Sequence, residues 1–250
     1  HTKDWFTCVF KASQTKIIPS EELKAAKSTM SAESYAQEFE CSFQAGISGA
    51  YFGKIMEDLD QKNRLTNFEI DEDLEVETWW DLGMNDSTVI TFAQRFGDEI
   101  RIIDCYENSG EGLEHYLNVI DDKPYKYSKH IAPHDIRVRE IGTNKSRWET
   151  AKELGLEFDI APKLSIEDGI EQVRRMLPKC YFHKNNCKKL IEALKSYCKR
   201  WDEKNNCFRN KPLHNWASHF CDSVRYGAIV EPVQRTDWSK PIRVETNYIV

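Results

Sequence analysis

Three β-rich runs in the middle of the chain constrain the fold more than any other feature. Residues 76–82, 88–96 and 100–106 are rich in β-branched and aromatic side chains, and only short connections separate them. Runs with this spacing predict three antiparallel strands joined by tight turns. Helix-like and strand-like patterns then alternate along the chain. The expected helices cover residues 113–120, 146–154, 165–177, 186–201 and 215–230, and the expected strands cover 127–132, 156–161 and 180–183. The sequence therefore predicts an α/β fold: a mixed sheet of an antiparallel three-stranded meander plus parallel strands, with helices on both faces.

The two ends of the chain carry weaker patterns. Residues 20–30 predict a helix, whereas residues 54–73 are polar and acid-rich without periodicity, so we expect an irregular connector there. We therefore divide the chain into an N-terminal segment or linker (1–70), a folded domain (71–230) and an extended C-terminal tail (231–250). Because the sequence starts at His1 and not at Met, we expect a piece excised from a longer protein.

Composition limits the class of protein. Of 250 residues, 40% are hydrophobic, which allows a sizeable core and argues against a disordered acidic tail or a disulfide-stapled miniprotein. No run approaches the roughly 20 apolar residues of a membrane span, and the N-terminus has no apolar signal core. The eight cysteines form no C-x-x-C pair. We therefore expect reduced, buried cysteines, no membrane contact and a protein that is not secreted.

Charge is distributed unevenly along the chain. Residues 1–122 carry a net charge of −15 and residues 123–211 one of +9, within a total of −6. A polyanion could bind the basic part while the acidic part keeps the chain soluble. Four basic residues follow the expected strand at 127–132 and are the best candidates for contacts with DNA phosphates: Arg137, Arg139, Lys145 and Arg147. The alternative is that these charges belong to ordinary solvated faces.

Three aspartates fall where the predicted strands and helices would aim them at one point. Asp81 ends the first strand of the meander, and Asp135 follows the strand at 127–132 after a proline. Side chains at neighbouring strand ends open onto the same crevice of an α/β sheet. Asp222 lies in the last expected helix, on a polar stripe. That stripe comprises Asn215, His219, Asp222 and Tyr226, and the opposite face, which we expect to be buried, carries Trp216, Phe220 and Val224.

Converging carboxylates need a cation, because they cannot all stay ionised in a dry site. Clustered hard oxygen ligands suit Mg²⁺ or Mn²⁺, and two such ions activate water and stabilise the leaving oxygen in phosphodiester cleavage. His219, one turn before Asp222, is a candidate to ligate the second ion or orient a water, and Asp86 is a weaker candidate ligand. These aspartates also have a purely structural interpretation, without any catalytic role. Asp81 and Asp86 would be turn residues, and Asp222 would be an i,i+3 surface partner of Arg225.

Motifs of several other enzyme classes do not occur in the sequence. There is no G-x-x-x-x-G-K-[ST] loop for nucleotide phosphates, no G-x-S-x-G elbow and no H-E-x-x-H pair. The three aspartates are therefore the constellation on which a chemical hypothesis is best built.

Several segments resemble one known family. They are DLGMNDST at 81–88, APHD at 132–135 and HNWASHFCDSVRY at 214–226, with YAQEFECSF at 35–43 upstream. The first three are similar to the C-terminal nuclease domain of tailed-bacteriophage terminase large subunits, in the ribonuclease H-like superfamily. The upstream segment resembles the boundary between the ATPase domain and the nuclease domain in that family.

The resemblance implies a ribonuclease H-like fold and a metal-dependent endonuclease that cuts concatemeric double-stranded viral DNA during genome packaging by a two-metal-ion mechanism. By position, Asp81, Asp135 and Asp222 match the family's catalytic metal-binding acids, and His219 matches a histidine that some members keep. Residues 1–70 would then include a remnant of the boundary with an absent ATPase domain. The implied partners are double-stranded DNA, the portal and the small terminase subunit, and the implied location is the host cell cytoplasm.

Two alternatives stay open from the sequence. Another ribonuclease H-like phosphotransferase, of the resolvase or transposase type, would use the same acids and prefer branched DNA. A non-catalytic docking module of the packaging motor would gain no stability from metal and would cleave nothing.

Overall fold

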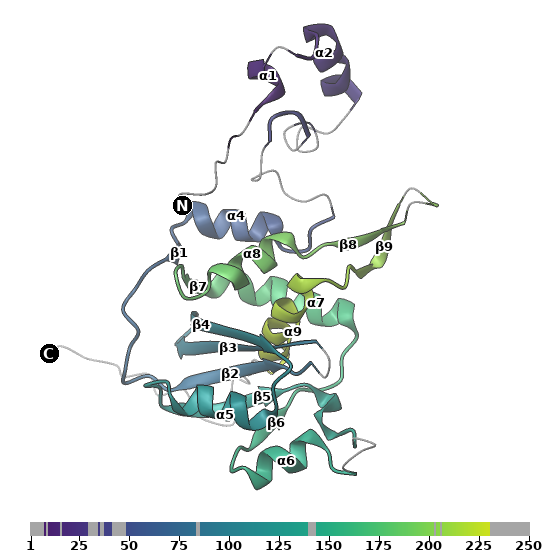
Figure 1. Ribbon diagram of the computed structural model, residues 1–250. Helices are drawn as coiled ribbons and strands as arrows, with labels where there is room; N and C mark the ends of the chain where they lie inside the picture. The colour runs from purple at the N-terminus through teal and green to yellow at the C-terminus, as the bar shows by residue number, and fades with distance from the viewer. Residues whose placement is uncertain are drawn as a thin grey trace, which may run out of the picture.

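A seven-stranded mixed sheet with helices on both faces forms the body of the protein (Figure 1). The computed structural model describes residues 8, 10–15, 17–29, 35, 38–41, 49–83, 86–139, 144–202, 204–205 and 207–230. The strands are β1 (Leu65–Thr66), β2 (Val76–Asp81), β3 (Ser87–Phe96), β4 (Glu99–Ser109), β5 (Tyr127–Ala132), β6 (Phe158–Ile160), β7 (Cys180–His183), β8 (Lys199–Asp202) and β9 (Cys207–Pro212). The α-helices are α1 (Ala12–Thr15), α2 (Ser20–Thr29), α4 (Gly53–Gln61), α5 (Leu113–Asp121), α6 (Arg147–Glu153), α7 (Ile166–Met176), α8 (Lys188–Ser196) and α9 (Trp216–Ile229), and the 3₁₀ helices are η1 (His134–Arg137) and η2 (Leu177–Lys179).

The sheet confirms the mixed topology predicted from the sequence. Its strand order is β1-β7-β4-β3-β2-β5-β6. The strands β2, β3 and β4 form the antiparallel meander. On one side of the meander, β5 is parallel to β2 and β6 is parallel to β5. On the other side, β7 is parallel to β4 and β1 is parallel to β7.

The interior strand β2 is buried on both faces, which explains its nearly continuous apolar sequence. Because side chains alternate along a strand, Trp79 and Trp80 point to opposite faces. Trp79 joins the core cluster that includes residues of α4, α7, α8 and α9. Trp80 joins the cluster on the α5 and α6 face and packs edge-on against Tyr116 and Phe158. Figure 1 shows the sheet between these two sets of helices.

Helix α9 lies unusually close to β2. A Cβ atom on Gly227 would lie 2.0 Å from Cδ2 of Trp79, so only glycine allows this approach. A buried hydrogen bond of 2.7 Å between the hydroxyls of Thr91 and Ser223 ties the same helix to β3. At the N-terminus of the helix, the Asn215 side chain accepts a hydrogen bond of 3.0 Å from the backbone N–H of Ala217. These contacts fix the position of α9 against the sheet.

Residues 54–73, expected as an irregular connector, instead contain the helix α4 and the strand β1. Met56 and Leu59 on α4 are buried in the core, and β1 pairs with β7 at the edge of the sheet. The apolar residues are too few in this short polar segment for its periodicity to be recognised. The domain boundary at residue 70 stays a prediction, although this packing favours a folded unit that begins near residue 49.

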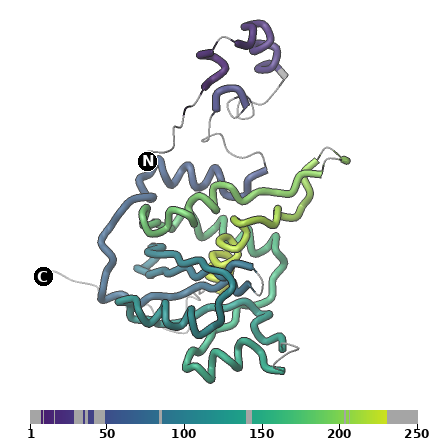
Figure 2. The backbone as a smooth tube through the Cα atoms, in the orientation of Figure 1, coloured from purple at the N-terminus to yellow at the C-terminus, as the bar shows by residue number. Residues whose placement is uncertain are grey.

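The single helix expected over 186–201 is wrong at its C-terminal end. Helix α8 ends at Ser196, because Tyr197 takes an extended conformation with ψ of 113° and buries its ring beside Tyr51 and Phe52. The chain then forms the hairpin of β8 and β9, which projects from the body of the protein (Figure 2). Trp201 on this hairpin packs edge-on against Phe208.

Two smaller expectations are corrected. Trp216, expected to be buried against the sheet, is 45% exposed, whereas Phe220 and Val224 are buried as predicted. Cysteine burial holds for Cys180, Cys187 and Cys221, but Cys8 and Cys207 are exposed, and the eight cysteines are free thiols. None of the helices in the described part of the chain combines the length and apolar character that spanning a bilayer requires. The tail expected at 231–250 lies outside the described residues.

Candidate active site

Asp81 and Asp222 meet where the end of β2 faces the middle of α9. The period of two along β2 places Asp81 on the same face as Trp79, which is the face that α9 covers. The pKa of the Asp81 carboxyl is raised to about 6: burial raises it most, the hydrogen bond with His219 lowers it, and the negative charge of Asp222 raises it. Two carboxylates that disfavour each other's charge in a poorly solvated site favour the binding of a cation.

Asp222 is held by Arg225, one turn further along α9. Both guanidinium contacts go to Oδ1 of Asp222, from Nε at 3.1 Å and from Nη2 at 3.0 Å. Burial raises the pKa of Asp222, and the charge of Arg225 opposes that rise. Arg225 is itself only 9% exposed. The i,i+3 pair is therefore not the solvated surface pair that the purely structural interpretation of Asp222 requires. Gly169 on α7 makes room for it, because a Cβ there would lie 2.5 Å from Cδ of Arg225.

His219 lies between Asp81 and Asp86. Its Nδ1 is 3.1 Å from Oδ2 of Asp81, and this hydrogen bond raises the pKa of the imidazole. Its Nε2 is 3.7 Å from Oδ1 of Asp86. The second carboxylate oxygen of Asp86 is 3.6 Å from Nε2 of His214. The structure thus brings the two weaker candidates, His219 and Asp86, next to each other and adds His214, which the sequence reasoning did not single out as a ligand.

Asp135 lies at the same edge of the sheet. It is in η1, directly after β5, and β5 runs parallel to β2 with Ile131 opposite Trp79. The ends of the two strands therefore open on the same side. The Asp135 residue is exposed, and no hydrogen bond joins it to the other two acids among the described residues.

Tyr226 on α9 reports the charge of all three acids. Burial raises the pKa of its hydroxyl most, Arg225 lowers it, and the charges of Asp81, Asp222 and Asp135 raise it. Asp81 and Asp222 are half-buried, whereas Asp135 is exposed. All three aspartates therefore act electrostatically on one phenol, which is consistent with a common site.

The four predicted DNA-contacting residues follow β5 and already make contacts within the protein. Nη1 of Arg147 donates a 2.8 Å hydrogen bond to the carbonyl of Leu82, one residue after Asp81. Lys145 pairs with Glu153 at 2.8 Å, and Arg139 approaches Glu149 at 4.0 Å. The guanidinium of Arg137 lies over the ring of Trp148. Exposed ion pairs of this kind are weak, so phosphates can compete for Arg139 and Lys145.

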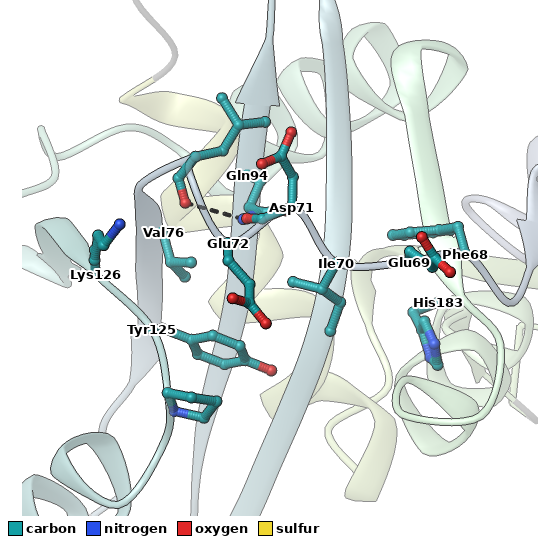
Figure 3. Close-up of a pocket in the computed structure, with 12 residues that line it drawn as sticks. Phe68, Glu69, Ile70, Asp71, Glu72, Val76, Gln94, Tyr125, Lys126 and His183 are labelled. Atoms are coloured by element: carbon teal, nitrogen blue, oxygen red, sulfur yellow. Dashed lines mark hydrogen bonds between the residues drawn. The ribbon is translucent and has the colours of Figure 1, made fainter.

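A cavity of about 620 Å³ lies at the opposite end of β2, where the strand begins (Figure 3). Gln94 on its wall donates hydrogen bonds to the carbonyls of Asp71 and Leu74, at 2.6 and 3.0 Å. Glu69, Asp71 and Glu72 also line it. This acidic lining repels phosphate groups, so the cavity does not compete with the aspartate group as a site for nucleic acid.

Solved structures similar to this one identify the class of the fold, and a sequence comparison identifies one curated relative. No family model matches the chain. The fold is similar to that of a large terminase from a thermophilic bacteriophage, with a TM-score of 0.54 and 18% identity over 71% of this chain and 45% of that one. A P22 large terminase nuclease domain matches with a TM-score of 0.48 and 17% identity over 67% of this chain and 87% of that one. The α/β fold class expected from the sequence, a mixed sheet with helices on both faces, is confirmed.

The sequence itself is 25% identical over 217 residues to the terminase large subunit of Escherichia phage T5. The match covers 82% of this chain and 47% of the relative, so the chain spans about half the length of the curated relative that it matches. The resemblance to terminase large subunits that the motifs at 81–88, 132–135 and 214–226 indicated is thereby confirmed.

Proposed function

We propose that this chain is a divalent-metal-dependent endonuclease that cuts concatemeric double-stranded viral DNA during genome packaging. The observation that carries the proposal is the pairing of Asp81 with Asp222 across β2 and α9, with Asp135 at the same sheet edge. The similarity to the terminase large subunit of phage T5 supports the substrate and the biological setting.

We assign Asp81, Asp135 and Asp222 as ligands for two Mg²⁺ or Mn²⁺ ions. Three carboxylates offer the hard oxygen donors that these ions prefer. The raised pKa of Asp81, caused by burial and by Asp222, supports the assignment, because a bound cation would relieve this unfavourable charge. When bound, such ions lower the pKa of the attacking water and stabilise charge on the phosphoryl and leaving oxygens.

The protein's own residues then orient the acids. His219 donates from Nδ1 to Oδ2 of Asp81 and so fixes the direction of that carboxylate. Arg225 holds Oδ1 of Asp222 in two hydrogen bonds and leaves its second oxygen for a ligand. Tyr226 packs beside the group with its hydroxyl protonated at neutral pH, since burial raises its pKa. A pre-oriented ligand set costs no rearrangement when the substrate arrives.

DNA is proposed to bind along the surface after β5. Arg137, Arg139, Lys145 and Arg147 would contact backbone phosphates, which gives affinity without sequence preference. Arg147 also has a structural role, because its hydrogen bond to the carbonyl of Leu82 connects this surface to the residue that follows Asp81. The portal and the small terminase subunit are proposed partners, and the host cell cytoplasm is the proposed location.

The test is cleavage of supercoiled and linear plasmid with Mg²⁺, Mn²⁺ or a chelator. We expect cleavage by the wild-type chain in metal, none in chelator and none by Asp81→Ala. The matched control is Asp98→Ala, which removes an exposed acid from the turn between β3 and β4 and should cleave normally. Full cleavage by Asp81→Ala would remove that residue from the mechanism.

The same experiment separates the two alternatives. A resolvase-type phosphotransferase would cut a four-way junction in preference to linear duplex. A docking module would leave plasmid intact in every metal, and its melting temperature would not rise when Mn²⁺ is added.

A further inference from the structure

We propose that His214, His219 and Asp86 form a separate transition-metal site, on the side of His219 that faces away from Asp81. The ligand of this site is a first-row transition-metal dication such as Zn²⁺, Co²⁺ or Mn²⁺. The proposal goes beyond the nuclease centre: it gives His219 and Asp86 to a different ion, adds His214, and does not depend on DNA cleavage.

The three ligand atoms converge on one point. The donor atoms of His214, His219 and Asp86 all lie within 4.8 Å of one another. The two nitrogen–oxygen distances are 3.6 Å for His214 and 3.7 Å for His219. Around a tetrahedral ion with bonds of about 2.0–2.2 Å, neighbouring ligand atoms are about 3.4 Å apart. Small rotations of the exposed side chains of His214 and Asp86 toward the buried His219 are therefore enough to close the site.

Both imidazoles have their Nδ1 atoms occupied by hydrogen bonds, which directs Nε2 of each ring to the metal. Nδ1 of His219 donates to Oδ2 of Asp81 at 3.1 Å, since an ionised carboxylate can only accept. Nδ1 of His214 is 3.0 Å from the hydroxyl of Ser218. That hydroxyl donates its one proton to the carbonyl of Asn215 at 2.6 Å, so it accepts from His214. Metal-binding histidines in proteins are held in this way by acceptors on their second nitrogen.

The backbone brings the three ligands together from two separate elements. His214 precedes the first residue of α9 and His219 lies on its first turn, with Asn215 as the cap between them. Asp86 lies just before β3, and its backbone passes close to Gly83. A Cβ on Gly83 would lie 2.6 Å from the carbonyl oxygen of Asp86, so this close approach requires glycine. An ion at this point would connect the start of β3 to the start of α9.

The donor set selects the class of metal. Two imidazole nitrogens and one carboxylate suit zinc, cobalt and manganese, whereas Mg²⁺ prefers oxygen ligands and retains its waters. The side chains of His214 and Asp86 are 72% and 61% exposed, which leaves an entry path and open positions for water. Affinity should follow the order Mn²⁺ below Co²⁺ below Zn²⁺.

The experiment is a Co²⁺ titration of the full chain, followed by its visible absorption, with the zinc content measured after dialysis. We expect one tightly bound equivalent that Zn²⁺ displaces, in addition to any Co²⁺ that binds to the three aspartates. His214→Ala and Asp86→Ala should each weaken Co²⁺ binding at least tenfold, since even the loss of an indirect partner costs about 10–100-fold. Both side chains are exposed, so both variants should keep the wild-type melting temperature.

Two variants keep this proposal distinct from the nuclease centre. Asp222→Asn should abolish plasmid cleavage and leave the Co²⁺ spectrum unchanged, whereas exposed His134→Ala should bind Co²⁺ like the wild type. The proposal is overturned if the wild-type chain binds no Co²⁺. It is also overturned if His214→Ala binds normally, or if Asp222→Asn loses the spectrum while His214→Ala retains it.

Discussion

Replacing Gly227 by alanine tests how closely α9 must approach β2. The new Cβ would lie 2.0 Å from Cδ2 of Trp79, a side chain that is fully buried and has no space to move into. Either the helix or the indole must shift, and overpacking of this kind costs about 1–3 kcal/mol. Helix propensity acts in the opposite direction, because alanine is favoured over glycine by about 1 kcal/mol in a helix interior.

Urea unfolding decides between these two effects. We expect Gly227→Ala to lower the free energy of unfolding by about 2 kcal/mol or more, since an overlap this large lies at the upper end of the overpacking range. In a Trp79→Leu background the same substitution should cost less, because the colliding ring is gone. Cleavage should also fall, as a shift of about 1 Å in catalytic geometry costs about 100-fold. If Gly227→Ala stabilises the wild-type protein, the close approach of helix and strand is refuted.

Three further predictions concern charge. Asp81 titrates near pH 6 when folded but near 3.9 when unfolded, so between these values the folded chain binds the extra proton. Without added metal, urea unfolding should show the wild type gaining stability relative to Asp81→Asn as the pH falls from 7 to 4. Arg225→Gln removes the charge that lowers the pKa of Asp222, so the acid limb of the cleavage profile should move to higher pH. Arg137→Ala should reduce the salt dependence of DNA binding by about one unit of slope, and exposed Lys163→Ala should not.

The sheet was predictable because its patterns are long and strong. The runs at 76–82 and 88–96 carry aromatic and β-branched side chains that are buried on both faces in β2 and β3. The capping serine at 146 and the acid three residues later form a full capping box at the start of α6, as helix-start chemistry requires. Such local signals act within a few residues, so one sequence suffices to recognise them.

Elements set by tertiary contacts were not predictable. Tyr197 ends α8 by packing against Tyr51 and Phe52, residues about 145 positions earlier in the chain. Nothing in the local pattern distinguishes it from a helical residue. Helix α4 was missed for a related reason, because only Met56 and Leu59 mark its buried side.

The residues of the candidate site likewise fall into a group that the sequence pattern predicted and a group that it did not. The strand ends and the helix stripe were enough to propose that Asp81, Asp135 and Asp222 converge. They were not enough to find His214, which lies in a loop and has no periodicity. The signal that could have found it is the spacing of two histidines, five residues apart, across a helix cap. Nor did the sequence indicate that Arg147 would bond to the backbone beside Asp81.

The central claim is that three aspartates act as one catalytic centre, and Asp135 tests it most directly because it is exposed. Plasmid cleavage in Mn²⁺ should be measured for Asp135→Asn beside Asp98→Asn, with melting temperatures recorded for both. The account predicts that Asp135→Asn loses cleavage by about 100-fold or more at an unchanged melting temperature, while Asp98→Asn cleaves normally. Cleavage by Asp135→Asn at the wild-type rate would contradict it.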